Sequence, residues 1–218
     1  MIGILGDPNS GKSVFSRVLG CLLELHSTKS VWVYDCDAAA LTSDWYVYGL
    51  QRARSQKEAS RLKQARESIK QKWTEYLESK VLERMQNVKK NLEYIVADFP
   101  GGYHDEGKGI HKRIPDAGRA DMLRCCDYFV IISRSDNAGA IGEWKSALDE
   151  YGLQGRVIAE LLSQDPDRDP AAESCCFDGL HVFHAAVCGL NRNKAREDIV
   201  TAFDLPFQEF TAAILSLQ

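Results

Sequence analysis

Short apolar runs recur along the chain, and each is bounded by Gly, Asp or Ser and too short to form a helix. Runs of this kind are typical of strands that are buried on both faces of a parallel sheet. They cover residues 2–5, 31–34, 94–97, 128–132, 157–161 and 180–183. Helical stretches lie between them, at residues 12–25, 118–125, 140–151, 194–203 and 206–217. This alternation predicts a doubly wound α/β fold with a largely parallel sheet and flanking helices.

One segment, from about 51 to 91, breaks the alternation because it contains neither Gly nor Pro. Its apolar residues recur at steps of three, four or seven, which predicts an amphipathic helix or a helical hairpin. The segment is also basic: residues 51–93 hold 12 Lys and Arg against 6 Glu, a balance of +6, which leaves −10 for the rest of a chain with net charge −4. A solvated helix face explains this charge, and so does a surface that binds an anionic substrate, RNA or DNA.

Length and composition indicate a single domain over residues 1–218, with a long basic helical insertion at about 51–91. A hydrophobic fraction of 44% and a charged fraction of 27% exclude wholesale disorder and fibrous architecture. The negative net charge argues against a protein that coats nucleic acid uniformly. The polar segment 163–178, which prolines interrupt, is expected to be a mobile surface loop between the last two strands.

Cysteine usage and hydrophobicity bear on the compartment. Seven cysteines without a Cys-x-x-Cys pair favour reduced, mostly buried thiols in a cytosolic protein. No apolar run is long enough to span a bilayer, and the first residues lead directly into a phosphate loop, which leaves no space for a signal peptide. We therefore expect a cytoplasmic protein without a membrane partner.

The loop after the first predicted strand fits the phosphate-loop pattern G-x-x-x-x-G-K-[ST], with an apolar strand before it and an amphipathic helix after it. Its glycines let backbone N–H groups and the start of the helix point at phosphate oxygens. Lys12 is expected to reach the β- and γ-phosphates of ATP, and the Ser13 hydroxyl to complete the shell of a Mg²⁺ ion. The predicted nucleotide contacts are Gly6, Asp7, Pro8, Asn9, Ser10, Gly11, Lys12, Ser13 and Val14.

A Mg²⁺ site also needs a carboxylate at the end of a neighbouring strand, and Asp98 follows the apolar run 94–97. Shortly after it, the backbone N–H of Gly101 can approach a γ-phosphate and report its loss. Ser13 and Asp98 are therefore the predicted metal ligands, and Gly101 is the predicted γ-phosphate sensor. The alternative is an ordinary strand that ends in an Asp turn.

Two further carboxylates, Asp35 and Asp37, follow the second predicted strand. In a parallel sheet this strand end lies on the same edge as the phosphate loop, so one of them is expected to face the γ-phosphate. There it would orient water, accept a proton from a substrate hydroxyl, or bind Mg²⁺ through water. Both would share one face of an extended strand, so the sequence does not rank them, and the alternative is that both only cap the turn.

The glycine-rich stretch after Asp98 carries several basic residues, and its composition is typical of a mobile lid. These residues are Lys108, His111, Lys112, Arg113 and Arg119. A guanidinium delivered by a loop stabilises the negative charge that phosphoryl transfer spreads over the γ-oxygens. Arg119 and Arg113 are the candidates for this role, and an ordinary surface charge is the alternative for each. The predicted catalytic set is Lys12, Asp35, Asp37 and Arg119.

The order of these motifs resembles the MinD/ParA and dethiobiotin-synthetase-like branch of P-loop proteins. The likeness rests on the phosphate loop, on Asp35-Cys-Asp37 and on Asp98-Phe-Pro-Gly101-Gly, and it covers about residues 1–50 and 92–160. It implies an ATPase or ATP-dependent kinase fold with ATP and Mg²⁺. A fainter likeness is to the P-loop module fused to certain CRISPR-associated ring nucleases, proteins that handle cyclic oligoadenylate.

Asp7 departs from the partitioning ATPases of that branch, which carry an additional lysine directly after the first loop glycine. In their dimers that lysine reaches the partner's nucleotide, so Asp7 argues against an ATP-sandwich dimer, and a homodimer of another kind stays open. The basic insertion is also unlike the partitioning proteins and more closely resembles the cover of a kinase acceptor site.

Three functions are compatible with these residues. The leading hypothesis is ATP hydrolysis coupled to an anionic or nucleic-acid-related partner. The second is a kinase that passes the γ-phosphate to a nucleotide, an RNA 5′ end or a small-molecule hydroxyl, with the acceptor held by Arg52, Arg54, Arg61 and Lys63. The third is a nucleotide-gated module that binds nucleic acid. No guanine signature is present, and Ser163-Gln-Asp-Pro stands roughly where one would fall, so the preference for ATP comes from the resemblance.

Overall fold

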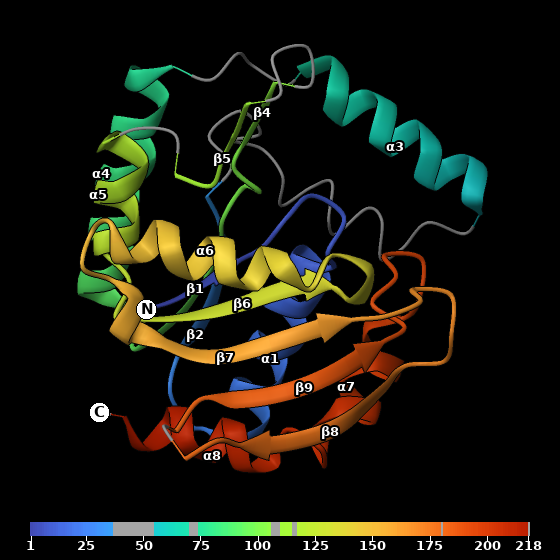
Figure 1. The fold of residues 1–218 in the computed structure, drawn as a ribbon. Helices are drawn as coiled ribbons and strands as arrows, with labels where there is room; N and C mark the ends of the chain where they lie inside the picture. Colours follow the sequence, from blue (N-terminus) through green and yellow to red (C-terminus); the bar gives the residue numbers. More distant parts are fainter. Residues whose placement is uncertain (37–54, 70–73, 106–109, 115–116, 180, 218) are drawn as a thin grey trace.

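A seven-stranded sheet forms the centre of the molecule, with its strands in the order β2-β3-β1-β6-β7-β9-β8 (Figure 1). The computed structural model describes residues 1–36, 55–69, 74–105, 110–114, 117–179 and 181–217. The strands are β1 (Ile2–Leu5), β2 (Val31–Asp35), β3 (Tyr94–Asp98), β6 (Tyr128–Arg134), β7 (Val157–Ser163), β8 (Ala171–Phe177) and β9 (Phe183–Cys188). All neighbours pair in parallel except β8 and β9. The predicted fold class is therefore confirmed.

The sheet extends in both directions from β1. Strands β3 and β2 lie on one side of β1, and β6, β7 and β9 lie on the other. In such sheets ligands bind outside the carboxyl ends of the strands, at the point where the strand order reverses. The loop after β1 lies at this point, because β1 pairs with β3 on one side and with β6 on the other.

Helices cover both faces of the sheet (Figure 1). One layer consists of α1 (Lys12–His26), α7 (Arg196–Asp204) and α8 (Gln208–Ser216). The other consists of α4 (Glu75–Asn91), α5 (Ala117–Arg124) and α6 (Gly139–Asp149). Each layer has its own buried apolar cluster, with Phe207 in the first and Trp144 in the second. The helices predicted outside the insertion are confirmed to within two residues at each end, and no helix in the described ranges is long and apolar enough to cross a membrane.

The basic segment forms two helices, α3 (Gln56–Ile69) and α4, as its periodicity predicts. Thr74 caps the start of helix α4, and its hydroxyl accepts a hydrogen bond from the N–H of Leu77 at 3.3 Å. Its residues Val81 and Met85 are buried against α5 and the sheet. Along the chain, α4 comes after β2 and before β3. Because these two strands pair in parallel, α4 is the packed helix of their crossover connection. In contrast, α3 lies apart from both layers in Figure 1, and none of its described side chains is buried.

The end of the sheet differs from the prediction. The segment 163–178 was expected to be a mobile loop, but it contains strand β8, which pairs antiparallel with β9. β8 is an edge strand with mostly exposed or half-buried residues, and a bulge between Glu173 and Cys176 interrupts its alternation, so it lacks an apolar run. The last predicted strand is shifted, because β9 begins at Phe183 and alternates buried side chains with half-buried ones such as His184. Residue 180 lies outside the described residues.

A short antiparallel hairpin follows the third strand. It consists of β4 (Tyr103–Asp105) and β5 (Ile110–Lys112), and Tyr103 pairs with Lys112 at its base. The glycine-rich stretch predicted as a lid is therefore a hairpin followed by helix α5 within the described residues, and Lys108 lies outside them.

Candidate functional site

The phosphate loop occupies residues 6–11, between the end of β1 and the start of α1. Gly6, Asn9 and Gly11 have φ angles of 149°, 63° and 86°, which let the backbone curl back on itself. A Cβ atom on Gly6 would lie 2.0 Å from the carbonyl oxygen of Ile132, and one on Gly11 would lie 2.9 Å from the Leu190 side chain. Gly6 is therefore required by close packing against backbone as well as by its conformation, and Gly11 chiefly by its left-handed conformation.

Lys12 folds back over this loop. Its Nζ donates a hydrogen bond to the carbonyl oxygen of Asp7 at 2.7 Å, and the residue is 8% exposed. Ser10 is buried, and its Oγ has no hydrogen-bond partner among the residues that the structure describes. Val14 packs into the core below, so only its main chain can face a ligand. The Lys12 ammonium, the Ser10 hydroxyl and the start of α1 therefore all belong to one curled loop, and loops of this kind bind phosphate.

Asp98 lies at the end of β3, directly beside β1, and its neighbour in the register is Ile4. Burial raises the pKa of the Asp98 carboxyl, while the charges of Lys12, Arg17 and Arg192 and a hydrogen bond from Ser13 lower it. The structure therefore brings Ser13 and Asp98 together, as the sequence predicts. Within the described part of the chain, Oδ1 of Asp98 is buried without a hydrogen-bond partner.

A buried carboxylate oxygen without a partner is costly, and a bound cation removes that cost. The hydroxyl and the carboxylate are oxygen ligands of the kind that Mg²⁺ prefers, and Mg²⁺ commonly takes only one or two protein ligands beside phosphates and water. No cluster of three or more His, Cys, Asp or Glu with metal-binding geometry occurs among the described residues. Ser13 and Asp98 therefore fit Mg²⁺ held together with a nucleotide.

Asp35 ends strand β2 and pairs in register with Asp98. It shares the edge of the sheet with the phosphate loop, but it lies two strands away from β1, a separation of roughly 10 Å between strand axes. Asp37 lies outside the described residues. The structure thus places Asp35 at the correct edge, and the choice between the two carboxylates stays a prediction.

Gly101 lies against the phosphate loop. A Cβ atom on it would be 2.6 Å from Cδ of Pro8 and 2.7 Å from the Pro8 nitrogen. The backbone after Asp98 therefore lies directly against the phosphate loop, and the role of Gly101 as a γ-phosphate sensor stays a prediction.

The two candidate arginines lie in different places. Arg119 was expected on a glycine-rich loop, but it belongs to helix α5 and is buried, with its Nε 3.8 Å from Oε1 of Glu78 in α4. That location is incompatible with delivery by a lid, because two packed helices enclose the side chain. Arg113, which follows β5, is the arginine that reaches the phosphate loop, where it forms an ion pair with Asp7.

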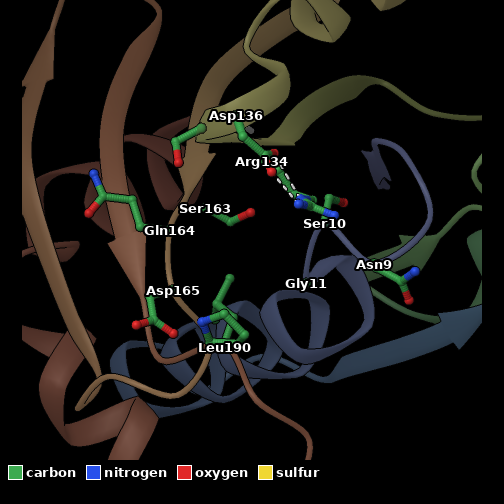
Figure 2. A pocket seen from close by; sticks show the side chains of 11 residues that line it. Asn9, Ser10, Gly11, Arg134, Asp136, Ser163, Gln164, Asp165 and Leu190 are labelled. Atoms are coloured by element: carbon green, nitrogen blue, oxygen red, sulfur yellow. Dashed lines mark hydrogen bonds and ion pairs between the residues drawn. The ribbon is translucent and has the colours of Figure 1, made fainter.

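A cavity of about 390 Å³ lies beside the loop, between the ends of β6, β7 and β9 (Figure 2). Figure 2 shows Ser10 and Gly11 on one side of it and Ser163, Gln164 and Asp165 on the other. The full lining is Asn9, Ser10, Gly11, Arg134, Ser135, Asp136, Ser163, Gln164, Asp165, Pro166 and Leu190. Its volume is that of a small-molecule site.

The far wall of this cavity is held by hydrogen bonds from neighbouring strands. Ser163 Oγ donates to the carbonyl of Ser133 at 3.2 Å, and the N–H of Gln164 donates to the carbonyl of Val187 at 2.7 Å. Residues 163–166 line the cavity, a role that the sequence did not predict, since it indicated a surface loop and the place where a guanine signature would fall.

Sequence reasoning missed two basic residues near Asp98, Arg17 and Arg192. Arg17 follows Ser13 by four residues in a helix, so the two share one face, and this spacing is a signal that the sequence contains. Arg192 lies in the loop between β9 and α7, far away in the sequence, and nothing local indicates its place.

Two solved structures that share this fold are plasmid partition proteins. A putative plasmid partition protein from Borrelia burgdorferi B31 bound to AMPPNP has a TM-score of 0.53 and 14% identity, and the match covers 97% of this chain and 98% of that one. A second structure of a plasmid partition protein from Borrelia burgdorferi has a TM-score of 0.51 and 13% identity over 97% and 98% of the two chains. The septum site-determining protein MinD from Pyrococcus horikoshii, complexed with Mg-ADP, has a TM-score of 0.46 and 14% identity over 74% and 69%.

No protein-family model matches the sequence, and neither does any curated protein. The fold and the phosphate loop together define a P-loop protein. It shares its fold with these two plasmid partition proteins, which agrees with the resemblance to the MinD/ParA branch in the sequence.

Proposed function

We propose that this protein binds Mg-ATP at the phosphate loop and hydrolyses it. The observation that carries the proposal is the meeting of three groups at one sheet edge: the curled loop with Lys12, the Ser13 hydroxyl and the buried Asp98 carboxylate. The AMPPNP in a structure of the same fold supports a triphosphate ligand.

Each group has a role in this proposal. Lys12 exchanges its bond with the Asp7 carbonyl for the β- and γ-phosphates, and backbone N–H groups of the loop hold the remaining oxygens. Ser13 and Asp98 hold Mg²⁺, which supplies charge neutralisation for the phosphates. Asp35 or Asp37 orients the attacking water, and Gly101, packed on Pro8, contacts the γ-phosphate through its N–H.

The cavity beside the loop provides a place for the nucleoside. It adjoins Asn9, Ser10 and Gly11, so a ligand whose phosphates lie on the loop extends naturally into it. The Leu190 side chain gives it an apolar wall, while Ser163, Gln164 and Asp165 offer polar groups that can orient a base or sugar.

A titration tests nucleotide binding. Mg-AMPPNP is added to wild type, to Lys12→Ala and to the control Lys90→Ala, which removes an exposed lysine of α4, and the heat of binding is measured. We expect Lys12→Ala to weaken binding by about tenfold or more, since it removes a charged hydrogen bond, and Lys90→Ala to bind like wild type. Equal affinity in wild type and Lys12→Ala would refute the proposed site.

Transfer of the γ-phosphate to an anionic acceptor is the second candidate, and helix α3 favours it. Lys57 and Arg61 are exposed on this helix, which does not join either layer of the fold. Arg52 and Arg54 lie outside the described residues, and the same helix would serve a nucleotide-gated module that binds nucleic acid. Labelled phosphate that appears on an added oligonucleotide supports transfer, whereas phosphate released without an acceptor supports hydrolysis.

A further inference from the structure

The phosphate loop carries a negative charge of its own, at Asp7. This residue is 8% exposed, and its carboxylate is held by three other side chains. Oδ1 forms an ion pair with Arg113 and accepts a hydrogen bond from Nε1 of Trp144 at 3.2 Å. Oδ2 accepts a hydrogen bond from Nδ2 of Asn137 at 3.0 Å.

A carboxylate in this loop opposes the binding of phosphate, because like charges repel strongly where water is scarce. Trp144 and Asn137 donate hydrogen bonds to Asp7 but bring no charge. Of these three partners of the Asp7 carboxylate, Arg113 is the one that brings a compensating charge, and it is itself buried, with 6% of its surface exposed.

Arg113 is also fixed in place from other sides. Its Nη2 donates to Oε2 of Glu143 in α6 at 2.6 Å, and its guanidinium lies 5.8 Å from the centre of the Trp144 ring. A Cβ atom on Gly102, at φ 87°, would lie 2.7 Å from the carbonyl of Lys112 and 3.2 Å from Cα of Arg113. The segment after Asp98, the end of the hairpin and the phosphate loop therefore pack as one unit.

We propose that Arg113 is a positioning residue of the nucleotide site, which cancels the charge of Asp7 and holds the phosphate loop against the segment that carries Gly101. This inference rests on the proposed function, since it concerns how the same site accepts a triphosphate. It replaces the expected role of Arg113 as a mobile arginine with a role that acts through Asp7. A purely packing role is the alternative, and the two are distinguished by whether removal of the Asp7 charge restores binding in the Arg113 variant.

The experiment compares Arg113→Ala with the double variant Asp7→Asn/Arg113→Ala. Calorimetric titration with Mg-AMPPNP gives the affinity, and Arg124→Ala, which removes an exposed arginine of α5, is the control. Removing one partner of a buried ion pair leaves the other charge uncompensated, so Arg113→Ala should weaken binding by about tenfold or more. Asp7→Asn keeps the shape of the side chain and removes its charge, so the double variant should return to within about threefold of wild type.

A second measurement, the fluorescence of Trp144, reports on the packing around Asp7 and Arg113 independently of nucleotide affinity. Trp144 touches both Asp7 and Arg113, so its fluorescence should change in Arg113→Ala without nucleotide, and circular dichroism should confirm that the variant is folded. Wild-type affinity in Arg113→Ala, or a folded double variant that binds no better than the single one, would overturn the inference. Failure of wild type itself to bind Mg-AMPPNP would instead refute the proposed function, and the inference with it.

Discussion

Asp98 and Asp7 are both buried carboxylates at the phosphate loop, but their surroundings differ. Asp7 has a guanidinium and two further donors around it. Asp98 has an oxygen without a partner among the described residues, and its pKa is raised by burial. The first is satisfied by the protein alone, while the second is suited to a cation that arrives with the ligand.

Substitution of Asp98 by Asn should therefore weaken Mg²⁺-dependent nucleotide binding and raise the free energy of unfolding. A raised pKa means that Asp98 favours folding below its ordinary value of 3.8, and this contribution is lost as the pH rises through the pKa of the folded state. In metal-free buffer, Asp98→Asn should accordingly gain stability over wild type as the pH rises from acid to neutral, by about 1–3 kcal/mol.

Denaturant unfolding at several pH values measures this difference, with Asp149→Asn, at an exposed position of α6, as the control. The same Asp98→Asn protein should lose the Mg²⁺ dependence of nucleotide binding. If the difference in the free energy of unfolding between wild type and Asp98→Asn stayed constant with pH, burial would not raise the pKa of Asp98 as described.

At the scale of elements, α4 and α3 belong to one basic segment but have different positions. Helix α4 buries Leu77, Val81 and Met85 in the core, whereas the described side chains of α3 are exposed or half-buried. The basic charge on α4 therefore lies on the solvated face of a core helix, and the charge on α3 is the part available to a partner.

Met85→Ala tests the place of α4 in the core. Met85 is fully buried and its Sδ lies 3.8 Å from the Cys36 thiol, so truncation should lower the free energy of unfolding by about 2–5 kcal/mol. Gln86→Ala, one residue further on and exposed, should change it by less than about 0.5 kcal/mol. Similar small effects for both variants, measured by denaturant unfolding, would show that α4 is not part of the core.

Strands buried on both faces could be predicted from the sequence because each forms a continuous apolar run, as Tyr94–Asp98 does. Strand β8 could not, because one of its faces is solvated and a bulge breaks its alternation. Helix α4 could be predicted as a helix, but its role as the crossover helix depends on the pairing of β2 with β3.

In the candidate site, too, some features could be predicted from the sequence and others could not. The phosphate loop and Asp98 are local motifs, so sequence suffices to find them. The ion pair of Asp7 with Arg113 joins the loop after β1 to the segment after β5, and the approach of Arg192 to Asp98 depends on the loop between β9 and α7. Neither pairing has a signature in sequence spacing.

At the scale of the whole molecule, the phosphate loop lies where the strand order reverses, with the cavity on the β6 and β7 side and Asp98 on the β3 side. In the proposed function, the nucleoside of ATP would lie in this cavity and its phosphates between Lys12 and Asp98, all at one edge of the sheet.

The most direct test of this account is the release of phosphate from ATP without any acceptor, measured for wild type and Lys12→Ala with and without Mg²⁺. We predict that wild type releases phosphate only with Mg²⁺, and that Lys12→Ala is slower by about a hundredfold, because a positioned charge is lost from the transition state. Release by Lys12→Ala at the wild-type rate, or no release by wild type, would contradict hydrolysis at the phosphate loop.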